Sequence, residues 1–197
     1  MSTPRETHKF DVSLHGVLHS VVRRRMLPER PALELLELGS GLVALEVGCG
    51  TGYFLLPMAV KVGYAIGVDV SEKMLRRCME RVRSARAANV GLVRCGESTI
   101  PLRSGSVQRV LIANALHEMH YPEKMLREVR RVLCQGGLVL VVEWKKRCLF
   151  GCLSGPPKAH RLSSAETEAL LIGAGFSGVE QCSVPYRRHY VLRAVKG

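Results

Sequence analysis

Hydrophobic residues along the chain fall into two alternating patterns. Short, mostly aliphatic runs predict buried strands at Ala44–Val47, Tyr64–Val68, Gly91–Arg94, Val107–Ala113 and Leu138–Glu143. Between them, apolar residues at three- and four-residue steps predict helices at Phe54–Val62, Glu72–Ala87 and Pro122–Cys134. Strands that are apolar throughout and alternate with amphipathic helices indicate a parallel sheet covered on both faces.

The two ends of the chain extend this pattern. Helices are predicted at Asp11–Met26 and Ala32–Leu38, separated by Pro28. Near the other end, Ser163 and Glu166 form a capping box that opens a further helix, and the last residues indicate two strands of a hairpin. The fold class is therefore α/β: one doubly wound, Rossmann-like domain with a seven-stranded, mostly parallel sheet, an antiparallel C-terminal hairpin strand and helices on both faces. Residues 1–40 are expected to form a helical extension or lid, and residues 41–197 the main domain.

Composition agrees with a single compact domain, since 47% of the 197 residues are hydrophobic and 23% are charged. The longest aliphatic stretch, Leu138–Val142, is too short to cross a bilayer, and the N-terminus does not resemble a secretory signal. We therefore expect a cytoplasmic protein without a membrane partner.

The net charge of +12 has two readings. It can indicate a polyanionic partner such as RNA. Alternatively, the basic residues form the solvated outer faces of helices, because they recur at helical spacing in three segments. These are Arg23, Arg24 and Arg25, then Lys73, Arg76, Arg77, Arg81, Arg83 and Arg86, then Lys124, Arg127, Arg130 and Arg131.

The seven cysteines do not indicate a metal site. Four of them lie inside apolar runs and are expected to be buried thiols, namely Cys49, Cys78, Cys95 and Cys134. Cys148 and Cys152, with His160 nearby, do not complete the four ligands that a structural zinc ion needs. We therefore predict no metal.

A glycine-rich turn follows the first predicted strand, with Gly48, Gly50 and Gly52 at every second position. A dinucleotide fingerprint would need its third glycine where this chain has Tyr53, and the phosphate-binding loop of nucleotide hydrolases is absent. Asp69 ends the second strand 19 residues after Gly50, the spacing at which a carboxylate meets ribose hydroxyls. Its alternative role as a helix N-cap is better filled by Ser71. Together these features favour a nucleoside ligand without a pyrophosphate.

Four motifs occur in order in this sequence: EVGCGTG, GVDVSEKML, NALHEM and MLREVRRVLCQGGLVLVVEW. With them the chain resembles the class I S-adenosylmethionine-dependent methyltransferases, in particular the small-molecule group known as methyltransferase type 11, from about His8 to the C-terminus. The resemblance implies S-adenosylmethionine as cofactor and S-adenosylhomocysteine as product. The cofactor-binding residues that it implies are Glu46, Gly48, Cys49, Gly50, Gly52, Asp69, Val70, Met74, Gly96, Glu97, Ser98, Asn114 and Ala115. The chain departs from the family at Gln108, where an Asp is frequent, and at Gln135, which replaces the Pro of a Pro-Gly-Gly turn.

Methyl transfer from a sulfonium is an in-line displacement, so a protein base is needed only for an acceptor that arrives protonated. Candidates follow the fourth strand at His117, Glu118 and His120, and Glu143 ends the fifth strand. We predict His117 and Glu143 as the catalytic residues; a purely structural role for His117, capping or packing under the next helix, is equally open. Trp144 and Lys145 are expected to shape the acceptor pocket, with part of the specificity coming from the N-terminal segment.

Three functions remain open from the sequence. The first is a methyltransferase acting on a small molecule. The second is an RNA or protein methyltransferase that uses the basic surface, although aromatic residues make up only 5% and no Asn-Pro-Pro-Tyr motif follows the fourth strand. The third is a non-catalytic cofactor-binding or assembly protein, which retention of the glycine loop and Asp69 disfavours.

Overall fold

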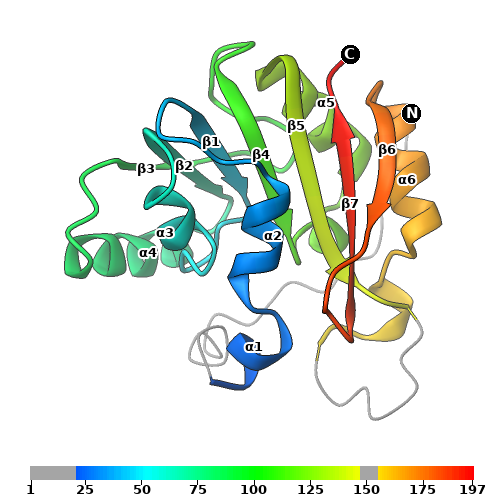
Figure 1. Cartoon of the computed structure of the whole chain (residues 1–197), viewed down its shortest axis with the longest axis horizontal. Coiled ribbons are helices and arrows are strands. Elements are labelled where there is room, and N and C mark those ends of the chain that lie inside the picture. Colours follow the sequence, from blue (N-terminus) through cyan, green and yellow to red (C-terminus); the bar gives the residue numbers. More distant parts are fainter. Residues whose placement is uncertain (1–20, 147–154) are drawn as a thin grey trace.

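The computed structural model describes residues 21–146 and 155–197, and its centre is one seven-stranded sheet (Figure 1). The strand order is β3-β2-β1-β4-β5-β7-β6. All neighbouring pairs from β3 to β5 are parallel, whereas β7 is antiparallel to both β5 and β6. The strands are β1 Val43–Val47, β2 Tyr64–Asp69, β3 Val90–Arg94, β4 Val107–Ala113, β5 Leu133–Trp144, β6 Ser177–Cys182 and β7 His189–Val195.

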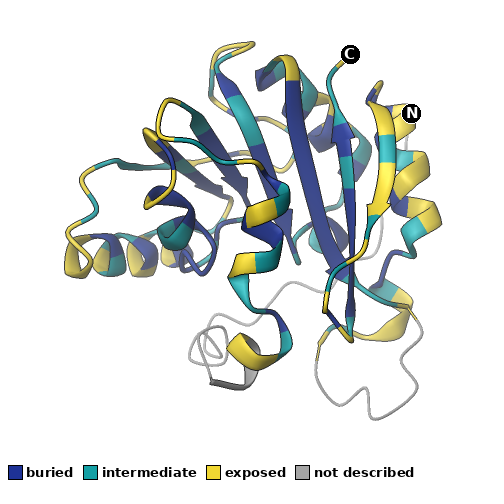
Figure 2. Cartoon of the chain, in the orientation of Figure 1, coloured by how far each residue is buried: buried dark blue, intermediate teal, exposed yellow. Residues whose placement is uncertain are grey.

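Helices cover both faces of the sheet, and the hydrophobic core is accordingly divided in two. The helices are α1 Val21–Met26, α2 Glu29–Leu35, α3 Leu55–Ala59, α4 Glu72–Ser84, α5 Pro122–Val132 and α6 Ser164–Gly173, with short 3₁₀ turns η2 Leu116–Glu118 and η3 Lys158–His160. Apolar residues of α2, α3 and α4 pack on one face, and those of α5 and α6 pack on the other. Figure 2 shows the consequence: the central strands are buried along almost their whole length, whereas the edge strand β6 is largely exposed.

The predicted fold class is confirmed, including the C-terminal hairpin at the edge of the sheet. The capping box is confirmed as well: the Ser163 hydroxyl accepts from the Glu166 amide at 3.2 Å, and the Glu166 carboxylate accepts from the Ser163 amide at 2.7 Å. Gln108, the departure from the family, has a structural use, because its side-chain oxygen accepts a hydrogen bond from the Val43 amide at 2.8 Å and so ties β1 to β4.

Several predicted boundaries are wrong. The helix expected at Ala32–Leu38 begins at Glu29, directly after Pro28, and ends at Leu35, before the left-handed Glu37. The helix expected at Phe54–Val62 is only Leu55–Ala59. β5 begins at Leu133 rather than Leu138, so the preceding helix ends at Val132 instead of Cys134. Cys134 is consequently only partly buried, whereas Cys49, Cys78 and Cys95 are buried thiols as expected. The part of the helix predicted at 11–20 lies outside the described residues.

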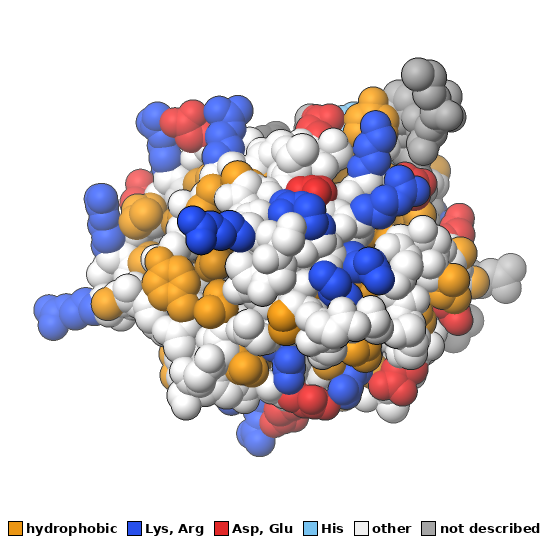
Figure 3. All heavy atoms as spheres, turned by 90° about the horizontal axis from the view of Figure 1, so that it is seen from above, with side chains coloured by type: hydrophobic (Ala, Val, Ile, Leu, Met, Phe, Trp, Pro, Cys, Tyr) orange, Lys and Arg blue, Asp and Glu red, His pale blue; other side chains and the backbone are white. Residues whose placement is uncertain are grey.

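Most basic residues of α4 lie on its outer face, and some pair with acidic residues of the same helix. Arg76 contacts Glu72 at 2.6 Å and Arg77 contacts Glu80 at 3.3 Å, while the helix buries Met74, Cys78 and Val82. Figure 3 shows the side of the molecule at the amino ends of the parallel strands. There, Lys and Arg are spread among acidic and apolar side chains. No helix in the described part of the chain is long and apolar enough to span a membrane.

Candidate active site

The glycine loop lies at the point where the chain reverses its order in the sheet. β2 and β3 follow β1 on one side, whereas β4 and β5 lie on the other, so the loop after β1 lies at the switch point between the carboxyl ends of β1 and β4. Ligands of such sheets bind at this place, which we call the crevice. Gly48, Gly50 and Gly52 all have positive φ angles of 71°, 51° and 79°. A Cβ at Gly50 would meet nothing within 4 Å, so the loop backbone there borders open space.

Asp69 holds the glycine loop in this shape. One carboxylate oxygen accepts from the Gly50 amide and the other from the Ser71 amide, both at 2.8 Å. Burial raises the pKa of Asp69, and hydrogen bonds from these backbone amides act against that rise. Ser71, not Asp69, caps α4, since its hydroxyl accepts from the Met74 amide at 3.3 Å. The carboxylate therefore ties the glycine loop to the residue before α4, and the cap of the helix is Ser71.

Asn114 occupies the facing side of the crevice, directly after β4. Its φ angle of 55° is left-handed, and its backbone amide donates to the Val142 carbonyl at 2.8 Å. The side-chain oxygen is buried and has no hydrogen-bond partner among the described residues. The next residue, Ala115, packs on the glycine loop so closely that a Cβ at Gly48 would lie 2.5 Å from its methyl group. The two sides of the crevice are thus in direct contact at its base.

The residues predicted to border the adenine follow β2 and β3. Val70 is 41% exposed although it is apolar, and Met74 is buried at the first turn of α4. Gly96, Glu97 and Ser98 lie in the loop after β3. The carboxylate of Glu97 faces His120 at 3.5 Å, which links this loop to the segment after β4. Glu46, predicted to hold the methionine end, is buried at the next-to-last position of β1, beside Gly67 of β2 and Leu111 of β4.

His117 and Glu143 form a buried pair at the ends of β4 and β5. The His117 Nδ1 lies 2.8 and 3.0 Å from the two carboxylate oxygens, which also accept from the backbone amides of His117 at 3.2 Å and Trp144 at 3.1 Å. Glu118 reaches the other ring nitrogen, Nε2, at 3.7 Å. The structure thus brings together two residues that the sequence predicts as catalytic only from their positions at strand ends.

Burial and pairing shift the pKa of each of these two residues in opposite directions. Burial by itself lowers the pKa of His117, but the charge and hydrogen bond of Glu143, aided by Glu118, outweigh it and raise the pKa above the usual 6.5. Burial likewise raises the pKa of Glu143, and His117 with the two backbone amides brings it below the usual 4.5. The carboxylates therefore favour the charged imidazole more than water would.

The sequence profile of the methyltransferase domain family matches residues 45–141, which include the glycine loop, Asp69 and the His117 segment. A crystal structure of an S-adenosylmethionine-dependent methyltransferase from Aquifex aeolicus superposes with a TM-score of 0.88 and 27% identity, covering 96% of this chain and all of that one. This chain belongs to the class I S-adenosylmethionine-dependent methyltransferases. The family resemblance of the four motifs is thereby confirmed, and S-adenosylmethionine is the cofactor of this family.

Two curated relatives are similar over part of their length. An uncharacterized chloroplastic methyltransferase of Arabidopsis thaliana is 35% identical over 115 residues, which are 55% of this chain and 33% of the relative. The demethylmenaquinone methyltransferase of Geobacillus stearothermophilus is 28% identical over 139 residues, 68% of this chain and 59% of the relative. This methyltransferase chain therefore spans between a third and three-fifths of these two relatives.

The residues of the crevice fit the cofactor of the family. The open backbone at Gly50 leaves room for a ligand, and the orphaned oxygen of Asn114 needs a donor such as the ammonium group of a bound amino acid. Apolar Val70, exposed beside Asp69, offers a surface for an adenine ring. In the described parts of this methyltransferase, no group of three or more His, Cys, Asp or Glu residues is arranged to hold a metal ion.

Three residues of the site were missed from the sequence. The hydroxyl of Tyr53 donates to the Leu27 carbonyl at 2.8 Å, so the tyrosine that rules out a dinucleotide fingerprint joins the glycine loop to the N-terminal segment. Arg81 donates to the Thr51 carbonyl at 2.7 Å and supports the loop from α4. Arg161, 2% exposed, lies over the ring of Trp144 at 5.5 Å. Of these three, only Tyr53 could have been found from the sequence, because it lies inside the glycine loop.

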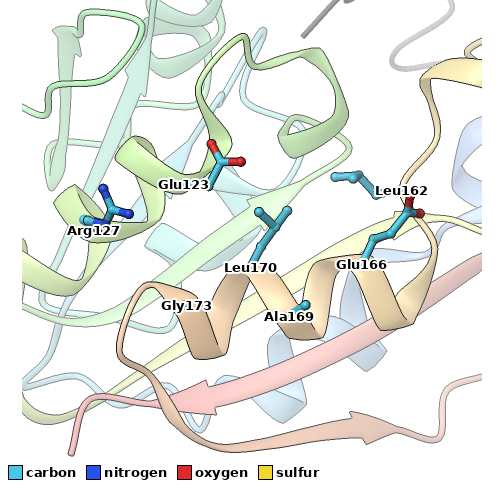
Figure 4. Close-up of a pocket in the computed structure, with 7 residues that line it drawn as sticks. All are labelled: Glu123, Arg127, Leu162, Glu166, Ala169, Leu170 and Gly173. Atoms are coloured by element: carbon cyan, nitrogen blue, oxygen red, sulfur yellow. The ribbon is translucent and has the colours of Figure 1, made fainter. Parts of the chain in front are cut away.

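A separate groove of about 360 Å³ lies between α5 and α6 (Figure 4). Its sides carry Glu123 and Arg127 from α5 and Glu166 from α6, and its apolar side chains are Leu162, Ala169 and Leu170. It contains none of the residues predicted for the cofactor or for catalysis. The groove is thus distinct from the crevice at the glycine loop.

Proposed function

We propose that this chain is an enzyme that transfers the methyl group of S-adenosylmethionine to a small molecule, with His117 as general base and Glu143 as its orienting partner. The observation that carries this proposal is the buried pair at 2.8 Å, which lies two residues beyond Ala115, the residue that contacts the glycine loop. A buried carboxylate fixes the orientation of the imidazole, as a general base needs.

The cofactor, when bound, supplies a methyl group that is already activated by the sulfonium. The chain positions it: the glycine loop amides and Glu46 would hold the methionine end, Asp69 the ribose, and Val70, Met74 and the Gly96–Ser98 segment the adenine. Asn114 and Ala115 would face the methionine end from the opposite side. These assignments follow the family motif and the open space above Gly50.

The proton chemistry belongs to His117. Its Nδ1 faces the carboxylate of Glu143, so that nitrogen carries the proton in the neutral ring and Nε2 is the basic atom. Nε2 would remove a proton from the acceptor as its nucleophilic atom attacks the methyl group. The carboxylate of Glu143 would then stabilise the imidazolium without taking the proton. Burial of the pair excludes water from this transfer.

The acceptor class that we propose is a quinone-type ring compound. Support comes from the relatives named demethylmenaquinone methyltransferases, which are 28–30% identical to this chain over more than half its length. A reduced quinone ring carries hydroxyl groups, and removal of a hydroxyl proton makes the neighbouring ring carbon nucleophilic enough to take the methyl group, which agrees with the His117 pair. The ring carbon then loses its own proton. Trp144, whose ring lies 4.2 Å from that of His189, would form part of the pocket wall. The N-terminal segment is proposed to cover this pocket, and the cytoplasm remains the proposed location although one relative is named chloroplastic.

The test combines cofactor binding with turnover. S-adenosylhomocysteine should bind both the wild type and His117→Gln, whereas transfer of labelled methyl groups to reduced demethylmenaquinone should fall by about 10²-fold or more in the variant. Glu180→Gln, at an exposed residue of the edge strand β6, is the control and should keep full activity. Unchanged turnover in His117→Gln would remove the base from the proposal.

RNA is the second candidate, favoured by the charge of +12. Binding that falls steeply with salt concentration, together with methylation of the RNA fraction of an extract, would support it. S-adenosylhomocysteine binding without transfer to the small-molecule, protein or RNA fraction would instead favour a non-catalytic cofactor-binding protein.

A further inference from the structure

Arg161 is a buried cation next to the proposed catalytic pair. It lies between η3 and α6. Figure 1 shows that α6 begins near the end of the sheet where β5 terminates. The Nε of Arg161 donates to the Pro156 carbonyl at 3.0 Å and its Nη1 to the Lys145 carbonyl at 3.2 Å. Lys145 is two residues beyond Glu143, so this side chain fastens the returning chain directly onto the strand end that carries the carboxylate.

The ring of Trp144 is part of the same arrangement. The guanidinium of Arg161 lies 5.5 Å from the ring centre, and Gly155 packs on the ring so closely that a Cβ there would lie 3.0 Å from it. Gly155 also has a φ angle of 104°, which an ordinary residue rarely adopts. The segment from Gly155 to Arg161 is therefore shaped to lie over Trp144.

Charge explains why a cation is placed here. His117 faces two carboxylates, Glu143 on β5 at 2.8 Å and Glu118 on η2 at 3.7 Å, and the positive charge of Arg161 acts against them. Together these three groups carry one net negative charge, which a protonated imidazole neutralises. Arg161 therefore offsets part of the negative charge, which is costly at the fully buried Glu143.

We propose that Arg161 is a positioning residue that fastens the Gly155–Arg161 segment over Trp144 and supplies the positive charge that balances the two carboxylates at His117. By opposing those carboxylates, Arg161 limits how strongly they favour the protonated imidazole. The catalytic value of this balance rests on the proposed function, but the balance itself is a property of the free protein.

The test therefore measures the titration of His117 directly and needs no acceptor. The imidazole Cε1–H signal of His117 is followed by NMR from pH 5 to 9 in labelled full-length protein, assigned by its absence in His117→Gln. Arg161→Met should raise the pKa of His117 by about half a unit or more, since a cation that disfavours the charged ring is removed. Arg161→Lys keeps the charge and should leave the pKa nearly unchanged. Arg187→Met, at an exposed residue before β7, is the control and should have no effect.

A second variant protects the test against misfolding of Arg161→Met. Glu118→Gln removes a carboxylate and should lower the pKa of His117, the opposite direction to Arg161→Met. Equal pKa values in the wild type, Arg161→Met and Glu118→Gln would overturn the charge balance. Equal shifts in the Met and Lys variants would overturn it too, because they would trace the effect to the lost hydrogen bonds. These pKa shifts do not depend on whether His117 acts as a base in catalysis. Failure of the proposed function and failure of the charge balance are therefore distinguishable.

Discussion

Replacing Glu143 with Gln keeps the size of the side chain and removes its charge. The substitution therefore measures how much the pair with His117 contributes to the free energy of unfolding. The carboxylate accepts from three N–H groups, the ring and amide of His117 and the amide of Trp144. A glutamine oxygen can serve one side only, and its NH₂ group then faces the N–H on the other side. One unsatisfied buried donor costs about 1–3 kcal/mol and the lost charge-assisted bond about 1.5–3 kcal/mol. We therefore expect the free energy of unfolding to fall by about 3–5 kcal/mol, in the range measured when one partner of a buried ion pair is removed.

The pH dependence of this loss follows from the two pKa shifts. The pKa of His117 is raised in the folded state, so its contribution is fully present below 6.5 and disappears as the pH rises through the folded value. The pKa of Glu143 is lowered, so its contribution is present above 4.5 and disappears as the pH falls through the folded value. The difference between wild type and variant should therefore be largest between about pH 5 and 6.5 and smaller at pH 9.

Urea unfolding at pH 6 and pH 9, followed by circular dichroism, measures this difference. Glu180→Gln, at an exposed carboxylate on β6, is the matched control and should change the free energy of unfolding by less than about 0.5 kcal/mol. A loss below about 1 kcal/mol in Glu143→Gln, or a loss that does not depend on pH, would refute a buried charged pair.

Three further substitutions test other parts of the structure. Gly52→Ala forces a methyl group to within 2.7 Å of the Cys78 thiol, at a φ of 79°. The affinity for S-adenosylhomocysteine, measured by calorimetry, should therefore fall at least about tenfold. Unchanged affinity would show that the loop tolerates a side chain. Tyr186→Phe removes the buried hydroxyl that bonds Ala32 N at 3.1 Å and Pro28 O at 2.8 Å, which should cost about 1–3 kcal/mol in urea unfolding without changing cofactor affinity. Ser163→Ala removes the cap of α6 and should cost about 1 kcal/mol, and a neutral result would contradict the capping box.

The sequence predicted most of the sheet because buried parallel strands are apolar throughout and therefore visible as runs. It failed where a continuous strand contains glycines. Gln135, Gly136 and Gly137 indicate a turn, yet the backbone of Gly136 and Gly137 bonds Lys196 after β7, so the strand continues through them. Pairing with a distant segment outweighed local propensity at this point.

The candidate site was predictable only where strand ends carry its residues. His117 and Glu143 are 26 residues apart, and the rule that parallel strands end at one edge was enough to place them together. Arg161 had no such signal, because it reaches the site from a segment without a strand end. The Leu27 contact of Tyr53 was equally hidden, since no local pattern specifies a backbone partner 26 residues away.

Calorimetric titration of the purified chain with S-adenosylhomocysteine, in parallel with Asp69→Asn, tests the central claim most directly. The account predicts one site of micromolar affinity in the wild type. Asp69→Asn removes the carboxylate that accepts from the Gly50 amide at 2.8 Å and that is proposed to bind the ribose. The affinity of this variant should be weaker by about 10-fold or more. No binding to the wild type, or equal binding to both proteins, would contradict it.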